Sequence, residues 1–216
     1  MPAQLGRTGL RHADPRRYNR ATCKTPPLGD GSFKGEVVRP LLKLTQAIDA
    51  LNEQIAHLAN WGVLLSCLIS AANAMIRYAF DSSSNAWLEI QWYLFAGVVM
   101  LGASYTLNKN EHVRVDILYG MLSDRGQKWL DLIGTIIFLI PVCVVIAYMS
   151  WHVFADSWSG DEMSTNSGGL IRWPFKLLLP LGFALVSLQG LSEVIKRALA
   201  LHGDVKLEVH YERPVQ

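Results

Sequence analysis

The sequence predicts an all-α integral membrane protein with four transmembrane helices and an amphipathic helical segment before them. Half of its 216 residues are apolar and only 18% are charged, whereas soluble domains carry about 25% charged residues. The charges avoid four windows of about 20 residues, the length with which a helix crosses about 30 Å of hydrocarbon. Apolar residues run continuously through these windows, which favours helices over the alternating strands of a membrane barrel. The predicted spans are about 61–80, 86–107, 128–155 and 173–199, within a transmembrane domain of residues 61–199.

Basic residues predict the orientation of these spans. Seventeen of the 20 Lys and Arg lie before residue 61, between residues 108 and 128, or from Lys196 onward. Only Arg77, Arg172 and Lys176 flank the spans on the other side. Because cytoplasmic segments carry the excess of Lys and Arg, we predict that both termini and the 108–128 loop are cytoplasmic. The chain is then a multi-pass protein of the bacterial inner membrane.

The two ends of the chain are predicted to be polar tails. Residues 1–36 are rich in Arg, Pro and Gly, which favours a disordered basic cytoplasmic tail. No apolar h-region of a secretory signal occurs in the first 40 residues. Residues 200–216 are predicted to form a second cytoplasmic tail.

Residues 37–60 are predicted to form an amphipathic helix. Their apolar residues recur at spacings of three and four: Leu41, Leu44, Ile48, Leu51, Ile55 and Leu58. The segment carries too many charges to span a bilayer. It therefore either lies on the cytoplasmic membrane surface or extends the first span to pack against a neighbouring helix.

Polar side chains line one face of the first span. Ser66, Ser70, Asn73 and Arg77 follow one another at spacings of four, three and four. A polar side chain in hydrocarbon costs free energy unless it is paired. This stripe is therefore predicted to meet another helix or a wet crevice, with helix packing and substrate contact as the alternatives.

The second span begins with an acidic residue in an aromatic belt. Trp87, Trp92 and Tyr93 are typical of a membrane interface. Glu89 lies among them, and Arg77 is its predicted partner. Small and large residues alternate on the face that contains Glu89, Tyr93, Ala96, Met100 and Ala103, which favours close helix packing.

The third and fourth spans each carry an internal proline, Pro141 and Pro180, and both are predicted to be kinked. The inner loop before the third span is predicted to form a short interfacial helix, and Ser123 or Asp124 can cap the span that follows.

The outer loop between these spans, residues 156–169, is acidic and rich in glycine. Gly168 and Gly169 predict a shaped turn. The acidic residues Asp156, Asp161 and Glu162 lie opposite Arg172 and Lys176, so the loop is either closed by local ion pairs or open to a charged partner.

Composition and motifs exclude several function classes. The net charge of +2 averages a basic inner face and a nearly neutral outer face, and gives no reason to expect a nucleic-acid partner. Cys67 and Cys143 lie inside apolar spans, so no disulfide is predicted. The sequence contains no phosphate loop, dinucleotide fingerprint or metal-spaced Cys and His set, and we predict that the chain is not an enzyme.

Two stretches carry a resemblance to a known family. They are Glu89-Ile-Gln-Trp-Tyr-Leu-Phe95 with Asn110-Glu-His-Val-Arg-Val-Asp116, and Ser167-Gly-Gly-Leu-Ile-Arg-Trp-Pro174. The chain resembles, over about residues 40–200, the small membrane subunit (Q, DctQ-like) of tripartite ATP-independent periplasmic (TRAP) transporters. The second stretch is similar to a subgroup that transports organic carboxylates, keto acids, or mannitol and chloroaromatic compounds.

The resemblance implies partners and no chemistry in this chain. A periplasmic substrate-binding protein would capture the solute, and a large membrane subunit (M) would carry the substrate and sodium sites. The small subunit would support the large one and help to dock the binding protein. No cofactor, metal or catalytic residue is expected in this chain. The predicted partner-interface residues are Ser66, Ser70, Asn73, Arg77, Glu89, Gln91, Trp92, His112, Arg114, Asp116, Asp161, Glu162, Gly168, Gly169, Arg172 and Trp173.

Two other functions remain as alternatives. Six histidines are compatible with a haem-holding membrane anchor of a redox enzyme, although His57 and His112 lie at the inner side and His152 at the outer side. An independent small carrier would use Glu89, Arg77 and Asn73 as its pathway. We see neither the inverted repeats nor the broken helices that such carriers show.

Overall fold

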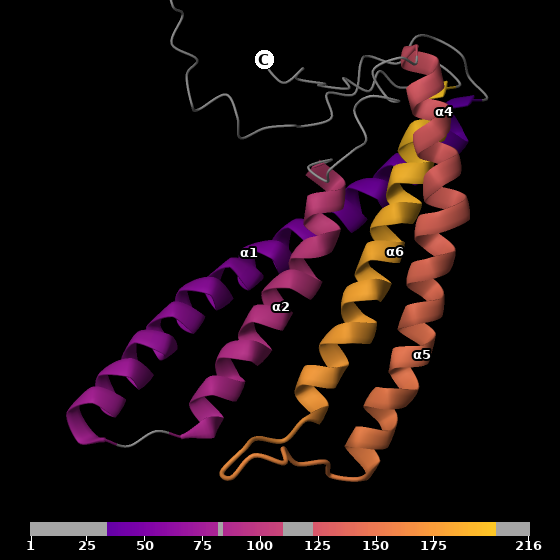
Figure 1. The fold of residues 1–216 in the computed structure, drawn as a ribbon. Helices are drawn as coiled ribbons and strands as arrows, with labels where there is room; N and C mark the ends of the chain where they lie inside the picture. The colour runs from indigo at the N-terminus through magenta and orange to yellow at the C-terminus, as the bar shows by residue number, and fades with distance from the viewer. Residues whose placement is uncertain (1–33, 82–83, 110–122, 202–216) are drawn as a thin grey trace, which may run out of the picture.

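The computed structural model describes residues 34–81, 84–109 and 123–201, which are helical apart from turns and one isolated bridge between Met163 and Ile171. In chain order the elements are α1 Lys34–Phe80, α2 Asn85–Lys109, α4 Asp124–Gly134, η2 Thr135–Leu139, α5 Ile140–Ser159 and α6 Trp173–Leu201 (Figure 1). The segments α4, η2 and α5 follow one another without a break and form one rod. The described residues thus contain four helical rods long and apolar enough to cross a membrane, as the sequence predicts.

The four rods form a row rather than a closed bundle. Helix α2 packs between α1 and α6, and α6 packs between α2 and α5. Figure 1 shows this order, with α1 crossing behind the others toward the start of α4. The first half of α1 also packs against α6. Because no rod is enclosed by the others, large apolar side chains remain exposed on all four, as expected of a protein that contacts lipid or membrane partners.

Helix α1 is a single helix of 47 residues, about 70 Å long at 1.5 Å per residue. Of the two alternatives for residues 37–60, the structure shows the one in which the amphipathic segment extends the first span. Its buried residues lie at spacings of three and four and face α2 and α6: Thr45, Ile48, Asn52, Ala56 and Ala59.

Each rod contains one stretch without Asp, Glu, Lys or Arg: 54–76, 90–108, 132–155 and 177–192. At 1.5 Å per residue these stretches are about 24 to 36 Å long, which matches a hydrocarbon core of about 30 Å. The charged residues that bound them gather at two ends of the row. We call the end where residues 160–172 join α5 to α6 the loop end, and the end where α4 begins and α6 ends the network end.

The third rod begins at a capping serine and contains a π turn next to its proline. Ser123 caps α4, since its Oγ accepts a hydrogen bond from Gly126 N at 3.4 Å. The π turn η2 ends two residues before Pro141, which lies in the first turn of α5. Proline cannot donate to the carbonyl one turn earlier, and a π turn accommodates that loss. The fourth rod, α6, continues through the buried Pro180.

Helices α2 and α6 approach closely, as the small residues predict. A Cβ added to Gly182 would lie 2.8 Å from Met100 Cβ, so only glycine fits there. Nearer the loop end, the rings of Tyr93 and Phe175 stack with centroids 5.0 Å apart. The face of α2 that carries Glu89 therefore points toward α6.

Candidate partner-binding surfaces

The loop end is organised around one buried carboxylate, Glu89 of α2, which is 4% exposed. It accepts hydrogen bonds from three donors in the loop between α5 and α6. Asn166 Nδ2 donates to Oε1 at 2.8 Å, and the backbone N–H of Leu170 donates to Oε2 at 2.7 Å. Ser164 Oγ also donates to Oε1. One carboxylate in a helix thus holds a loop that is about 80 residues away in the sequence.

The predicted pairing of Glu89 with Arg77 is wrong. Arg77 is exposed near the end of α1 and forms no ion pair with a described residue. The physical reason is the orientation of α2, because Glu89 lies on the side that packs against α6. The donors of the 164–170 segment lie there, whereas α1 lies on the opposite side of α2.

The loop is shaped by its own backbone as well. Leu170 O accepts from Ser164 N at 2.9 Å, and Glu162 O accepts from Arg172 N at 2.9 Å, flanking the bridge between Met163 and Ile171. Gly168 has φ +71°, which confirms the predicted turn at a position that favours glycine. A Cβ on Gly169 would lie 3.0 Å from Asn166 O. Asn85 Nδ2 at the start of α2 donates to Ser167 O at 3.1 Å, which adds a second attachment of the loop to α2.

Local ion pairs close one part of the acidic loop and leave another part open. Glu162 pairs with Lys176, and with Arg172 at 3.4 Å. The hydrogen bond from Lys176 lowers the pKa of the Glu162 carboxyl to about 2. Asp156 and Asp161 are exposed and have no ion pair with a described residue. Trp173 lies edge-on against Trp158 with centroids 4.4 Å apart, so it supports the loop base.

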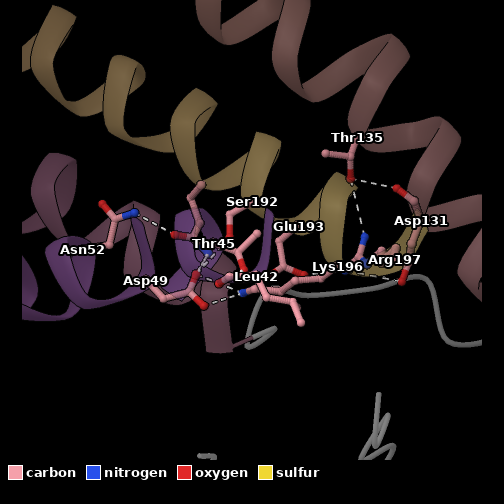
Figure 2. A network of polar contacts seen from close by, with 11 residues as sticks. Leu42, Thr45, Asp49, Asn52, Asp131, Thr135, Ser192, Glu193, Lys196 and Arg197 are labelled. Atoms are coloured by element: carbon pink, nitrogen blue, oxygen red, sulfur yellow. Dashed lines mark hydrogen bonds and ion pairs between the residues drawn. The ribbon is translucent and has the colours of Figure 1, made fainter. Parts of the chain in front are cut away.

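The network end contains a polar cluster that the sequence analysis missed. Figure 2 shows Asp49 of α1 among polar side chains of α6. Lys196 Nζ contacts both Asp49 oxygens, at 2.9 and 2.7 Å. Gln189 Nε2 and Ser192 Oγ also donate to Asp49 Oδ1, at 2.9 and 3.1 Å. Asn52 Nδ2 donates to Gln189 Oε1 at 2.6 Å.

The same cluster extends from α6 to the third rod. Arg197, which is buried, forms ion pairs with Asp131 and Glu193 at 3.6 and 3.5 Å. It also lies 3.5 Å from Thr135 Oγ1, which donates to Asp131 O at 2.7 Å (Figure 2). The cluster therefore joins three rods through two cations and three carboxylates. The sequence does carry a pattern that could have indicated this cluster. Polar residues recur at spacings of three and four in both helices: Thr45, Asp49 and Asn52 in α1, and Gln189, Ser192 and Lys196 in α6.

The polar stripe of the first span has no such partners. Ser66, Ser70 and Asn73 form no hydrogen bond with a described residue, and Ser70 is exposed. Gln91 of α2 has a buried Nε2 without a hydrogen-bond partner, while Trp92 is largely exposed beside it. Among the described residues, the structure therefore brings no donor or acceptor to Ser66, Ser70 or Asn73.

Three predicted interface residues, His112, Arg114 and Asp116, lie outside the described residues, as does the predicted interfacial helix. Of the histidines considered for haem, His57 lies in α1 and His152 in α5, at opposite ends of the charge-free stretches. No group of three His, Cys, Asp or Glu side chains that could hold a metal occurs among the described residues.

Comparison with known proteins decides the family. The family model described as "Tripartite ATP-independent periplasmic transporters, DctQ component" matches residues 66–200, more than half of the chain. The chain belongs to the DctQ family. This DctQ-family chain is therefore a small permease subunit of a TRAP transporter, a multi-pass membrane protein and not an enzyme. The alternative of a redox-enzyme anchor is set aside by this result.

Two curated relatives are similar over part of their length. A putative TRAP transporter small permease protein of Haemophilus influenzae is 33% identical over 108 residues, 46% of this chain and 66% of that protein. The C4-dicarboxylate TRAP transporter small permease protein DctQ of Vibrio cholerae is 29% identical over 89 residues, 40% of this chain and 38% of that protein. The matched regions thus span less than two thirds of both relatives. No solved structure matches the chain.

Proposed function

We propose that this DctQ-family subunit supports a large membrane subunit, which carries the substrate and sodium sites, and helps to dock a periplasmic binding protein. The complex would take up organic carboxylates or related solutes across the bacterial inner membrane. The family supports a tripartite assembly, and the Vibrio cholerae relative is named for C4-dicarboxylates.

The absence of a polar cavity enclosed by the described rods carries this proposal. A carrier needs a polar site near the middle of the membrane, commonly built from broken helices. Two grooves among the described residues, of about 390 and 670 Å³, are lined mostly by apolar side chains. A carboxylate would lose its hydration there without gaining hydrogen bonds. The apolar lining of these grooves supports our proposal that the translocation site lies in the large subunit.

The test is transport by reconstituted proteins. Proteoliposomes with this chain alone should show no sodium-driven uptake of an organic carboxylate, and uptake should appear when the large subunit and the binding protein are added. Omitting only this chain should reduce uptake. Uptake by the chain alone would instead establish the independent carrier.

The proposed orientation places the loop end in the periplasm, since 17 of the 20 basic residues lie on the other side. Reporter fusions after Ser83 and Asn166 should behave as periplasmic, and fusions after Arg125 and Gln216 as cytoplasmic. A periplasmic signal at Arg125 would contradict this orientation.

The exposed carboxylates of the loop are the proposed docking contacts. Asp161 has no ion pair with a described residue, whereas Glu162 is paired with Lys176 and Arg172. Asp161→Lys should therefore raise the concentration of binding protein needed for half-maximal uptake, with membrane assembly intact. Asp81→Lys, at the loop end but outside this loop, is the matched control. If the Asp161→Lys variant needs the same concentration of binding protein for half-maximal uptake as the unsubstituted chain, Asp161 has no docking role.

A further inference from the structure

One face of α1 forms hydrogen bonds with other helices in its first half, and in its second half it forms none with a described residue. Residues at alternating spacings of four and three run along this face for the whole helix: Thr45, Asp49, Asn52, Ala56, Ala59, Val63, Ser66, Ser70, Asn73 and Arg77. Packed helices show this spacing along their contact face, the seam, where the side chains of one helix fit between those of the facing helix. In the first half the facing residues belong to α2 and α6.

The seam opens beyond Gly62. A Cβ on Gly62 would lie 3.0 Å from Val98 Cγ2, which marks the close approach of α1 and α2. From there toward the loop end the two helices separate, as Figure 1 shows. Gln91 lies two turns from Val98 on the same face of α2, and its buried Nε2 has no partner. Both walls of the opening thus carry unpaired polar groups.

Ser66 and Ser70 differ from the serines and threonines in the charge-free stretches of the other rods, each of which donates a hydrogen bond. The hydroxyls of Ser104, Thr106, Thr135, Ser150 and Ser187 donate to carbonyls of their own helix, three or four residues earlier. Ser66, Ser70 and Asn73 form no hydrogen bond with a described residue. Since hydrocarbon offers no hydrogen bonds, lipid chains alone leave this face unsatisfied.

We propose that the open half of this face, Ser66, Ser70, Asn73 and Arg77 together with Gln91, binds a transmembrane helix of the large subunit. This inference rests on the proposed function. The bound helix would carry hydrogen-bonding side chains opposite Ser70 and Asn73 and an acceptor or carboxylate at the level of Arg77. A second copy of this chain fits poorly, because a two-fold axis along the membrane normal would place Arg77 beside Arg77.

Photo-crosslinking tests the surface in the assembled transporter. The full-length chain is co-expressed with the tagged large subunit of its own transporter, and a photoreactive amino acid replaces Ser70 or, as the matched control, Leu68. Leu68 lies at nearly the same depth but on the opposite face of α1, and it is 58% exposed. The product with the large subunit should be several times more abundant from position 70 than from position 68. Equal yields, or a product that contains two copies of this chain, would overturn the inference.

A substitution pair provides a second readout. Asn73→Leu should lower the amount of large subunit that co-purifies by about threefold to fivefold, the effect of one lost hydrogen bond in a membrane. Ala71→Leu introduces the same side chain on the other face and should leave co-purification unchanged. Equal co-purification of both variants contradicts the inference while leaving the proposed function intact. Failure of the unsubstituted chain to co-purify with the large subunit contradicts the proposed function itself.

Discussion

The two halves of α1 present the same sequence pattern in two different environments. Near the network end, Asp49 and Asn52 are hydrogen-bonded to α6. Near the loop end, Ser70 and Asn73 occupy the equivalent positions of the repeat and have no partner among the described residues. Regularly spaced polar residues on a membrane helix therefore indicate a contact face, but they do not indicate whether a helix of the same chain or of another subunit packs there.

Removing Asp49 should have the largest effect on the stability of the chain. In Asp49→Ala the Lys196 ammonium and the Gln189 and Ser192 donors lose their common acceptor. Breaking a buried ion pair costs about 3 to 5 kcal/mol. Because this pair is partly exposed, we expect Asp49→Ala to lower the unfolding free energy by about 3 kcal/mol. Reversible unfolding in detergent micelles measures it. Glu53→Ala, one turn away and exposed, is the control. Similar losses for both variants would show that the network does not stabilise the row.

A matched pair of substitutions compares the two halves directly. Asn52→Leu should lower the unfolding free energy of the isolated chain by about 2 kcal/mol, because it leaves the fully buried Gln189 carbonyl unsatisfied. Asn73→Leu should change it by no more than about 0.5 kcal/mol, as for substitutions away from a packed feature. The same unfolding assay on the isolated chain measures both. If Asn73→Leu costs as much as Asn52→Leu, the face near the loop end is occupied within the chain, and the contrast fails.

Glu89→Gln should produce an intermediate effect confined to the loop. The amide places an N–H₂ group against at least one of the donors Ser164, Asn166 and Leu170 N–H. A lost hydrogen bond to a charged group costs about 1.5 to 3 kcal/mol. The loss of this hydrogen bond should appear as faster amide hydrogen exchange at Leu170. Amides in the middle of α5 should exchange at an unchanged rate. Gln91→Leu, on the same helix but facing away from the loop, is the control. Unchanged exchange at Leu170 would show that Glu89 does not hold the loop.

Acidification should give the smallest effect, again within the loop. The pKa of Glu162 is lowered from its ordinary value of 4.5 to about 2 by the hydrogen bond from Lys176. A lowered pKa means that the folded loop prefers the carboxylate, so the contribution is complete above about pH 5 to 6 and is lost as the pH falls through 4.5 toward 2. Exchange at Arg172 N–H, which donates to Glu162 O, should accelerate over this range relative to its intrinsic rate. In Glu162→Gln this pH dependence should be absent, and its persistence would assign the effect to another group.

The four apolar spans could be predicted from the sequence, and so could a helix cap at Ser123 or Asp124, of which the structure shows Ser123. These features follow from local physics, since uncharged helices of about 20 residues are the stable form of the chain in hydrocarbon. The motifs around Glu89 and Gly168 were also sufficient to suggest the family, which the match over residues 66–200 then established. The positive φ of Gly168 was predictable for the same local reason.

The pairing of polar residues depends on how the helices pack in three dimensions. Spacing along α2 places Glu89 on a helical face, but the packing of α2 against α6 directs that face to the 164–170 loop instead of Arg77. Likewise, Asp49 and Lys196 are far apart in the sequence, and only the crossing of α1 over α6 joins them. Helix formation depends on neighbours three and four residues away, whereas side-chain pairing between helices depends on their order, tilt and register. Composition and spacing do not fix these three quantities in a layer of nearly uniform apolar rods.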